Sequence, residues 1–253
     1  GRKRENIKVY ASGMYFSKAK NLPQVLAKEA LSYKRAGFGA MKMKVGLGGE
    51  EDVKNVRAVR EALGPDVALM VDANHAFSFH EALKLARAIE DYDITWFEEP
   101  LIPEDYDGYR ELRKRTSIPI AGGECEFLRA GFLNLFKNRS VDIAQPDICA
   151  AGGITEVKKI AGFAQAFGVE LTPHCWGAGI ALSAALHFMS NWDVIPGRLR
   201  EPEPLLEFDR TENPLREELV KPQFVVKDGR ITAPEHPGLG VDIDETILRK
   251  YSL

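Results

Sequence analysis

The sequence predicts an α/β protein whose parallel strands close into a barrel of the TIM type, and three observations support this fold class. Short apolar runs alternate with amphipathic, helix-like segments along almost the whole chain of 253 residues. Ionisable residues end or follow these runs at intervals of 23 to 28 residues, which is about the length of one strand, one helix and two loops. No glycine-rich phosphate loop follows the first run, which disfavours the competing doubly wound open sheet.

Capping residues mark the boundaries of the expected helices. Asn21 and Pro23 are typical of a helix start, and Gly37 is typical of a helix end. Ser78 and Glu81 form a capping-box pattern before an apolar stripe. Helices are therefore expected from 21 to 37, over 50–63, from 78 onward, over 105–115, over 127–136, from 154 to the glycine at 168, and over 179–190.

The expected strands lie between these helices. Each is a short apolar run, and together they cover residues 9–11, 41–44, 67–72, 94–98, 118–121, 141–145 and 169–172. Seven or eight units of this kind fit a barrel, in which functional groups gather at the C-terminal ends of the strands. A barrel brings the ionisable residues into one mouth, whereas an open sheet spreads them along an edge.

The composition is that of an ordinary globular protein. Formal net charge is -3, so there is no basic surface that would indicate binding to nucleic acid or to an acidic membrane. No apolar run approaches the ~20 residues of a membrane-spanning helix. Cys125, Cys149 and Cys175 are odd in number and far apart, which argues against a disulfide framework and favours a reducing, cytoplasmic setting. The chain begins at Gly1 rather than at a methionine, so its sequence carries no information on targeting.

Two lysines stand at the end of the strand expected over residues 41–44. Side chains two positions apart on a strand point to the same face, so Lys42 and Lys44 should project side by side. Two ammonium groups this close lower each other's pKa, which suits a base that works near neutral pH with a cation beside it. The alternative is an edge strand with two solvated lysines. The ionisable residues downstream favour the first interpretation.

Three carboxylates, Asp72, Glu98 and Glu124, are expected to end three successive strands about 4.8 Å apart. Converging carboxylates repel one another unless a cation holds them, and their oxygens are the ligands that Mg²⁺ prefers. Strand neighbours alternate in direction, which favours Glu98 over Glu99 as a ligand; the same argument favours Glu124 over Glu126. Each acid taken singly is more typical of a surface or capping residue.

Asp147 and His174 are expected at the ends of two adjacent strands, opposite the lysines. A carboxylate that accepts a hydrogen bond from one ring nitrogen fixes the tautomer and makes the other nitrogen a better base. The alternative is a structural histidine. Alternation directs Cys175 away from His174, which argues against a Cys/His nucleophile. Asn74 and His75 follow Asp72 closely and are candidate substrate contacts.

Several motifs in this order resemble those of the enolase superfamily, in its mandelate racemase and muconate lactonizing enzyme branch. The motifs are Lys-Met-Lys-Val-Gly at 42–46, Val-Asp-Ala-Asn-His-Ala-Phe at 71–77, Trp-Phe-Glu-Glu-Pro at 96–100, Ala-Gly-Gly-Glu at 121–124, Gln-Pro-Asp at 145–147 and Thr-Pro-His at 172–174. Leu-Leu-Glu-Phe-Asp at 205–209 and His-Pro-Gly-Leu-Gly at 236–240 extend the resemblance over essentially the whole chain.

The resemblance implies a modified (β/α)7β barrel with one Mg²⁺ per site, bound by Asp72, Glu98 and Glu124. Sites of this superfamily use a lysine or histidine base with Mg²⁺ that stabilises an enediolate. It implies that Lys44 is one base, with Lys42 beside the substrate carboxylate. It further implies that His174, oriented by Asp147, is the acid/base on the opposite face, and that Glu207 hydrogen-bonds the enolate.

The resemblance also predicts the domain organisation. Residues 1–253 are expected to form a single catalytic barrel domain with a C-terminal tail over about 208–253. Members of this branch carry an N-terminal α+β capping domain, which we expect to be absent here, so the sequence is expected to be a fragment. Relatives commonly assemble, so a homo-oligomer is expected.

Four functions remain open at this point. The favoured one is dehydration of a sugar acid, in which His174 or Lys44 takes the α-proton and His174 protonates the departing β-hydroxyl. Polar Asn74 and His75 suit a polyhydroxylated ligand, and the family's substrates favour this function. The second is a racemase or epimerase of a 2-hydroxy acid or a related carboxylate. The third is a Schiff-base aldolase, which leaves the three carboxylates unexplained, and the fourth is a non-catalytic barrel.

Overall fold

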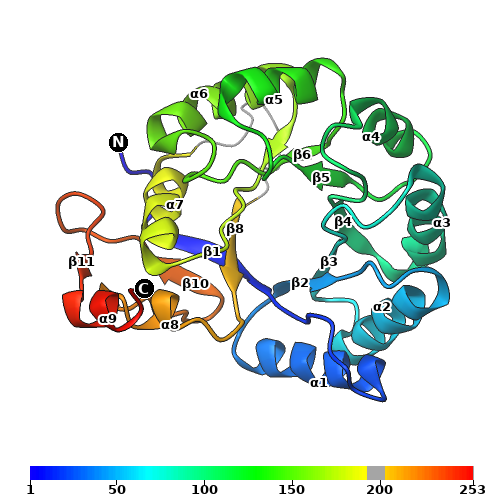
Figure 1. The fold of residues 1–253 in the computed structure, drawn as a ribbon, viewed down its shortest axis with the longest axis horizontal. Helices are drawn as coiled ribbons and strands as arrows, with labels where there is room; N and C mark the ends of the chain where they lie inside the picture. The colour runs from blue at the N-terminus through cyan, green and yellow to red at the C-terminus, as the bar shows by residue number, and fades with distance from the viewer. Residues whose placement is uncertain (193–202, 253) are drawn as a thin grey trace.

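A ring of parallel strands surrounded by helices forms the centre of the molecule in the computed structural model, which describes residues 1–192 and 203–252 (Figure 1). Parallel pairing runs in the order β8-β1-β2-β3-β4-β5-β6-β7, so the predicted barrel topology is confirmed. The strands are β1 (Asn6–Ser12), β2 (Ala40–Lys44), β3 (Ala68–Asp72), β4 (Ile94–Glu98), β5 (Ile120–Gly122), β6 (Ile143–Ala144), β7 (Glu170–Leu171) and β8 (Leu205–Asp209).

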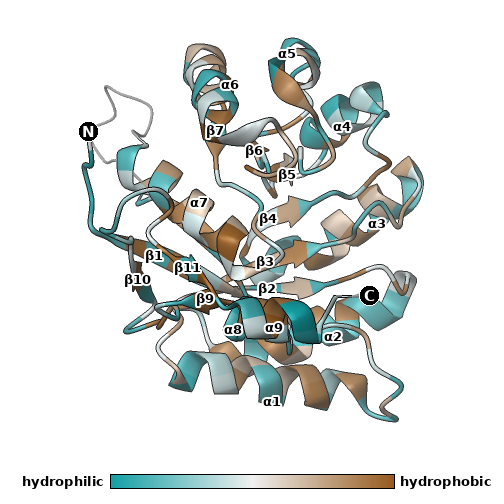
Figure 2. Cartoon of the chain, turned by 60° about the vertical axis from the view of Figure 1, so that its left-hand side comes forward, coloured by the Kyte–Doolittle hydropathy of each residue, from teal (hydrophilic) through white to brown (hydrophobic). Residues whose placement is uncertain are grey.

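Each of the first seven strands is followed by a helix on the outside of the ring (Figure 1). The predicted capping box at Ser78 and Glu81 is present, and Gly168 ends its helix in the left-handed conformation. These helices are α1 (Leu22–Arg35), α2 (Gly49–Leu63), α3 (Phe79–Ile89), α4 (Tyr106–Arg113), α5 (Leu128–Lys137), α6 (Gly153–Phe167) and α7 (Gly179–Asn191). Apolar and polar residues interleave along α1 and α6, as expected for helices with one buried face (Figure 2).

Smaller elements complete the chain. An additional strand, β10, pairs antiparallel with the first half of β1. The remaining elements are the short helix η1 (Glu90–Tyr92), α8 (Pro214–Glu217), β9 (Val220–Lys221), β10 (Arg230–Thr232), β11 (Asp242–Ile243) and α9 (Glu245–Lys250). Among the described residues, no helix has the length and apolar character needed to cross a membrane.

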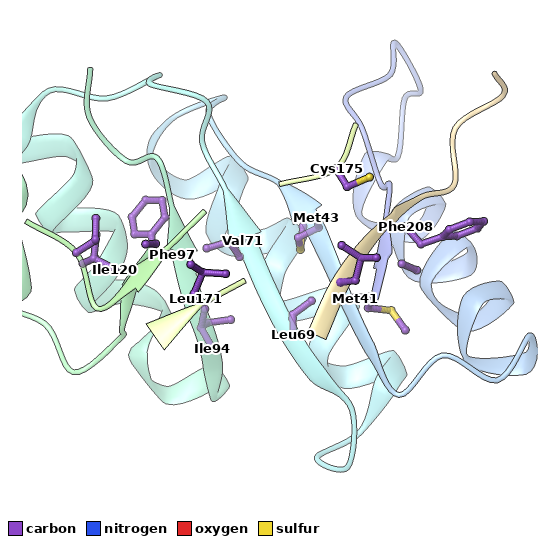
Figure 3. Packing of buried hydrophobic residues seen from close by; sticks show 14 of the residues in the cluster. Met41, Met43, Leu69, Val71, Ile94, Phe97, Ile120, Leu171, Cys175 and Phe208 are labelled. Carbon is purple, nitrogen blue, oxygen red and sulfur yellow. The ribbon is translucent and has the colours of Figure 1, made fainter. Parts of the chain in front are cut away.

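Alternation along the strands separates two buried layers. Outward-facing residues such as Met41, Met43 and Phe97 pack between the ring and the helices (Figure 3). Inward-facing residues form a second cluster of Tyr10, Ala40, Met70, Trp96, Ala121 and Ile143 inside the ring. Since Met41 and Met43 face outward, Lys42 and Lys44 face inward, as the sequence predicts.

The ionisable residues after β5, β6 and β7 do not end their strands, which corrects one expectation. Asp72 and Glu98 are the last residues of β3 and β4, but Glu124, Asp147 and His174 lie two or three residues past the ends of much shorter strands. Gly123, with a φ of 122°, turns the chain directly before Glu124. Strand alternation therefore does not decide where these three side chains point, and the loops do.

Candidate active site

Lys42 is at the centre of a buried group of charged residues inside the barrel mouth. Its side chain is 1% exposed, and its Nζ pairs with Glu98 Oε1, lies 3.0 Å from Glu207 Oε1 and lies 3.4 Å from Asp72 Oδ2. Burial on its own lowers the pKa of this ammonium, but the charges of Glu207 and Glu98 outweigh burial and raise it well above its ordinary value. The expectation that the two lysines lower each other's pKa is therefore wrong for Lys42.

Lys44 lies beside Lys42 at the edge of this group. Its Nζ is 2.6 Å from Asp72 Oδ2 and donates to Asn74 Oδ1 at 2.5 Å, and it lies 5.2 Å from the centre of the Tyr15 ring. The Asp72 carboxylate also accepts the backbone N–H of Asn74 at 2.9 Å. Burial raises the pKa of Asp72, but Lys42 and Lys44 outweigh burial, so the pKa lies below its ordinary value. The lysine pair thus shares one carboxylate rather than facing solvent.

Glu98 is held by two residues to which sequence reasoning assigned no role. Its Oε2 accepts hydrogen bonds from Trp96 Nε1 at 2.9 Å and from Gln145 Nε2 at 2.6 Å. Burial raises the pKa of Glu98 to about 7, and the repulsion of Asp72 adds to burial while Lys42 opposes it. Trp96 stands two positions before Glu98 on the same face of β4, so strand alternation could have identified it.

Glu207 reaches the same mouth from β8, far along the sequence. It is buried, and its Oε2 accepts the backbone N–H of Cys175 at 3.0 Å. Burial raises the pKa of its carboxyl, but the charges of Lys42 and His174 outweigh burial and lower it to about 2. Glu207 is therefore ionised and lies between the lysine side and the histidine side of the mouth.

His174 is oriented by Asp147, as the sequence predicts. Its Nδ1 lies 2.8 Å from Asp147 Oδ2, while Nε2 lies 3.5 Å from Glu124 Oε2 and 3.9 Å from Glu207 Oε2. Burial lowers the pKa of the imidazole, but the hydrogen bond to Asp147 and the nearby carboxylates raise it to about 9. Asp147 is fixed in turn by the backbone N–H groups of residues 149 and 150.

Three further predictions concern neighbours of these residues. Glu126, which the sequence disfavours as a metal ligand, accepts a hydrogen bond from the Tyr106 hydroxyl at 2.6 Å. Cys175 packs in the apolar layer outside the ring, pointing away from the mouth as expected (Figure 3). His75 lies 3.2 Å from Glu99. Whether His75 and Asn74 contact substrate stays a prediction.

The arrangement as a whole has three carboxylates in a row with a base candidate at each end. Asp72 contacts Lys44, and Glu124 contacts His174, with Glu98 between the two acids along the ring. Residues 25–247 of the chain match the family described as enolase C-terminal domain-like.

The chain belongs to the enolase superfamily.

Known members of the enolase superfamily include enzymes that act on sugar acids. The chain is 41% identical over 255 residues to D-galactarolactone cycloisomerase of Agrobacterium fabrum, covering 100% of this chain and 67% of that protein. It is 33% identical over 252 residues to arabinonate dehydratase of Saccharolobus solfataricus, covering 99% of this chain and 65% of that protein. The crystal structure of the 3,6-anhydro-D-galactonate cycloisomerase from Zobellia galactanivorans superposes with a TM-score of 0.91 at 52% identity, covering 99% of this chain and 67% of that one.

These enolase superfamily relatives are longer than the present chain. Among the curated relatives that it matches, the chain spans from about half to two thirds of their length. The relatives are dehydratases and cycloisomerases, so the resemblance seen in the motifs is confirmed at the level of the superfamily.

Enolase superfamily sites use Mg²⁺, and the residues present here fit such an ion. Asp72, Glu98 and Glu124 offer only carboxylate oxygens, which is the donor set that a hard divalent cation prefers. Asp72 and Glu124 both raise the pKa of Glu98, so the three negative charges oppose one another in a buried place. A divalent cation would relieve this repulsion.

Proposed function

We propose that this chain is the catalytic barrel of a Mg²⁺-dependent enzyme that removes the proton α to the carboxylate of a sugar acid and expels the oxygen on the β carbon. The observation that carries the proposal is the placement of Lys44 and His174 at the two ends of one row of carboxylates. Residues 1–253 would form this catalytic domain, with the residues after about 208 as its tail.

In this proposal Asp72, Glu98 and Glu124 hold the metal. When bound, Mg²⁺ supplies positive charge that stabilises the negative charge developing on the substrate carboxylate. The protein keeps one of these ligands in place, since Trp96 and Gln145 fix Glu98 through one oxygen.

Lys42 and Glu207 would position the substrate carboxylate and its enediolate. The Lys42 ammonium stays protonated because of its raised pKa, so it acts as a fixed positive charge and hydrogen-bond donor. This state argues against Lys42 as the nucleophile of a Schiff-base aldolase, because a nucleophilic lysine has to be neutral. Glu207 joins Lys42 to the histidine side of the mouth through its two oxygens.

Two side chains account for the proton transfers of this reaction. One base, His174 Nε2 or Lys44 Nζ, accepts the proton from the α carbon, and the C–H electron pair forms the enediolate double bond. The bond between the β carbon and its oxygen then breaks, and a proton from His174 goes to that oxygen. Glu124 is one of the charges that raise the pKa of His174, so offsetting that charge would lower the pKa and favour proton acceptance at Nε2. The resulting enol tautomerises to a 2-keto-3-deoxy acid.

The nature of the departing oxygen separates two reactions of the same site. If the oxygen is a free hydroxyl, water is lost and the reaction is a dehydration. If the oxygen belongs to a ring of the substrate, the ring opens and the product is an isomer. The two cycloisomerases share 52% and 41% identity with the chain and the arabinonate dehydratase shares 33%, which favours a ring oxygen as one leaving group to test.

A matched pair of substrates tests this function. Each pair consists of an aldonate with a free 3-hydroxyl and the same aldonate with a 3,6-anhydro ring. We expect the protein with Mg²⁺ to convert at least one member of each tested pair to a 2-keto-3-deoxy acid. The product is scored colorimetrically with semicarbazide, and EDTA should abolish its formation. Failure of every sugar acid to give this product, with Mg²⁺ present, would contradict the proposal.

A racemase or epimerase is the second candidate, because Lys44 and His174 come from different sides of the mouth. It would exchange the α-proton of a 2-hydroxy acid with solvent and return the substrate or its epimer, without a keto product. The cytoplasmic setting and the homo-oligomer stay predictions.

A further inference from the structure

A second set of possible metal ligands lies just outside the carboxylate row. Three consecutive strand-to-helix loops place His75, Glu99 and Cys125 together, one to three residues beyond Asp72, Glu98 and Glu124. His75 Nε2 lies 3.2 Å from Glu99 Oε2 and 3.7 Å from Cys125 Sγ. One ligand atom from each of the three residues lies within 4.8 Å of the other two.

These separations match those of tetrahedral zinc. With Zn–N and Zn–O distances of about 2.1 Å and a Zn–S distance of about 2.3 Å, tetrahedral ligands lie about 3.4 Å (N to O) and about 3.6 Å (N to S) apart. The corresponding distances here are 3.2 Å and 3.7 Å. Both distances from His75 Nε2 therefore suit a shared tetrahedral ion, and the Glu99 and Cys125 ligand atoms lie within 4.8 Å of each other. Such an ion would have a fourth position for water or another ligand.

Unpartnered buried atoms point independently to a ligand at this place. The Glu99 side chain is 2% exposed, and its Oε2 lies 3.2 Å from His75 Nε2 without a well-aligned hydrogen bond to any residue in the described part of the chain. The Nδ1 of His75 is likewise buried without a partner among residues 1–192 and 203–252. Buried polar atoms are normally hydrogen-bonded, so a buried carboxylate oxygen that faces an imidazole and a thiol without an aligned hydrogen bond suits a cation.

We propose that His75, Glu99 and Cys125 form a second metal site, which takes a thiophilic divalent cation such as Zn²⁺. Thiolate and imidazole are ligands of Zn²⁺ and related transition metals, whereas Mg²⁺ prefers oxygen ligands. The site is thus chemically distinct from the carboxylate row of Asp72, Glu98 and Glu124. In this site His75 binds a metal rather than the substrate.

The bound ion would join the three loops that follow the strands of the carboxylate row. Each of its ligands follows one carboxylate of that row by one to three residues, so fixing the ligands restricts the same three loops. The proposed role is to hold the active-site loops in position, and it does not depend on which sugar acid the enzyme uses.

Cobalt is the probe that tests this site. The protein is titrated with Co²⁺ in an excess of Mg²⁺, which keeps the carboxylate row occupied. We expect one equivalent of Co²⁺ to produce a thiolate-to-metal charge-transfer band in the near ultraviolet and intense visible bands typical of tetrahedral geometry. Zn²⁺ should displace the Co²⁺ and remove these bands.

Two cysteine variants provide the matched comparison. Cys125→Ser should remove the charge-transfer band and weaken Co²⁺ binding by about tenfold or more, because the thiolate is lost. Cys149→Ser changes another exposed cysteine and should leave both unchanged. His75→Ala should weaken binding while retaining the charge-transfer band at saturating Co²⁺.

Three results would overturn the proposal. Absence of the charge-transfer band in the unmodified protein would show that no thiolate binds the metal, and its survival in Cys125→Ser would show that Cys125 is not the thiolate ligand. Loss of the band in Cys149→Ser would place the site elsewhere. Because Cys125 and Cys149 are both exposed, neither substitution should prevent folding, and an unchanged circular dichroism spectrum checks this.

Discussion

Replacing His174 by asparagine should lower kcat/KM on the sugar acid by a factor of about 10² to 10⁴, the usual contribution of a general acid or base. The imidazole is held by Asp147 through Nδ1 and presents Nε2 toward Glu124 and Glu207. Asparagine keeps a polar side chain of similar reach but has no titratable nitrogen. Steady-state assays of the 2-keto-3-deoxy product measure the loss.

The control for this variant is His80→Asn, which changes an exposed histidine outside the mouth and should leave the rate unchanged. A loss of less than about threefold in His174→Asn would remove this residue from the proton steps. Deuterium exchange of the substrate α-proton adds a second readout. If exchange persists in the variant while product formation stops, Lys44 removes the proton and His174 acts as the acid on the leaving oxygen.

Replacing Lys42 by methionine should lower the free energy of unfolding by about 3–5 kcal/mol when no Mg²⁺ is present, because it leaves buried charges without their partner. Methionine has a similar length, so packing changes little. The ammonium contacts Glu98, Glu207 and Asp72, and all four side chains are almost completely buried. Urea denaturation in EDTA measures the change, and Lys54→Met, on an exposed lysine, is the control.

A double variant separates charge from packing. If unpaired charge causes the loss, adding Glu207→Gln to Lys42→Met should recover part of the stability, since one of the opposed carboxylates is removed. Losses that simply add would show that packing around Lys42 is responsible. Mg²⁺ should also stabilise Lys42→Met more than the unmodified protein, because the ion then takes over the role of the lost positive charge.

The parts of this site that lie within strands were predictable from sequence. Lys42, Lys44, Asp72 and Glu98 belong to β2, β3 and β4, where alternation fixes which side chains face the mouth. The same alternation applied to Trp96 would have identified it as a partner of Glu98. The barrel itself was predictable because strand and helix signals recur at a constant interval.

The loop residues were not predictable in the same way. The recurring interval placed Glu124, Asp147 and His174 at the mouth, but they lie beyond their strands, so alternation does not fix where their side chains point. The predicted direction of the Lys42 pKa shift was wrong for a related reason. It depends on Glu207, a residue of β8 far along the chain, whose proximity only the closing of the barrel establishes.

The central step of the proposed reaction is removal of the proton next to the substrate carboxylate, and incorporation of deuterium from solvent measures it directly. Turnover of the sugar acid in D₂O with Mg²⁺, followed by proton NMR, should show one deuterium at C3 of the 2-keto-3-deoxy product, delivered when the enol formed by α-proton loss tautomerises. If no sugar acid gives a deuterated product or exchanges its α-proton, with Mg²⁺ present and the protein folded, the account is contradicted.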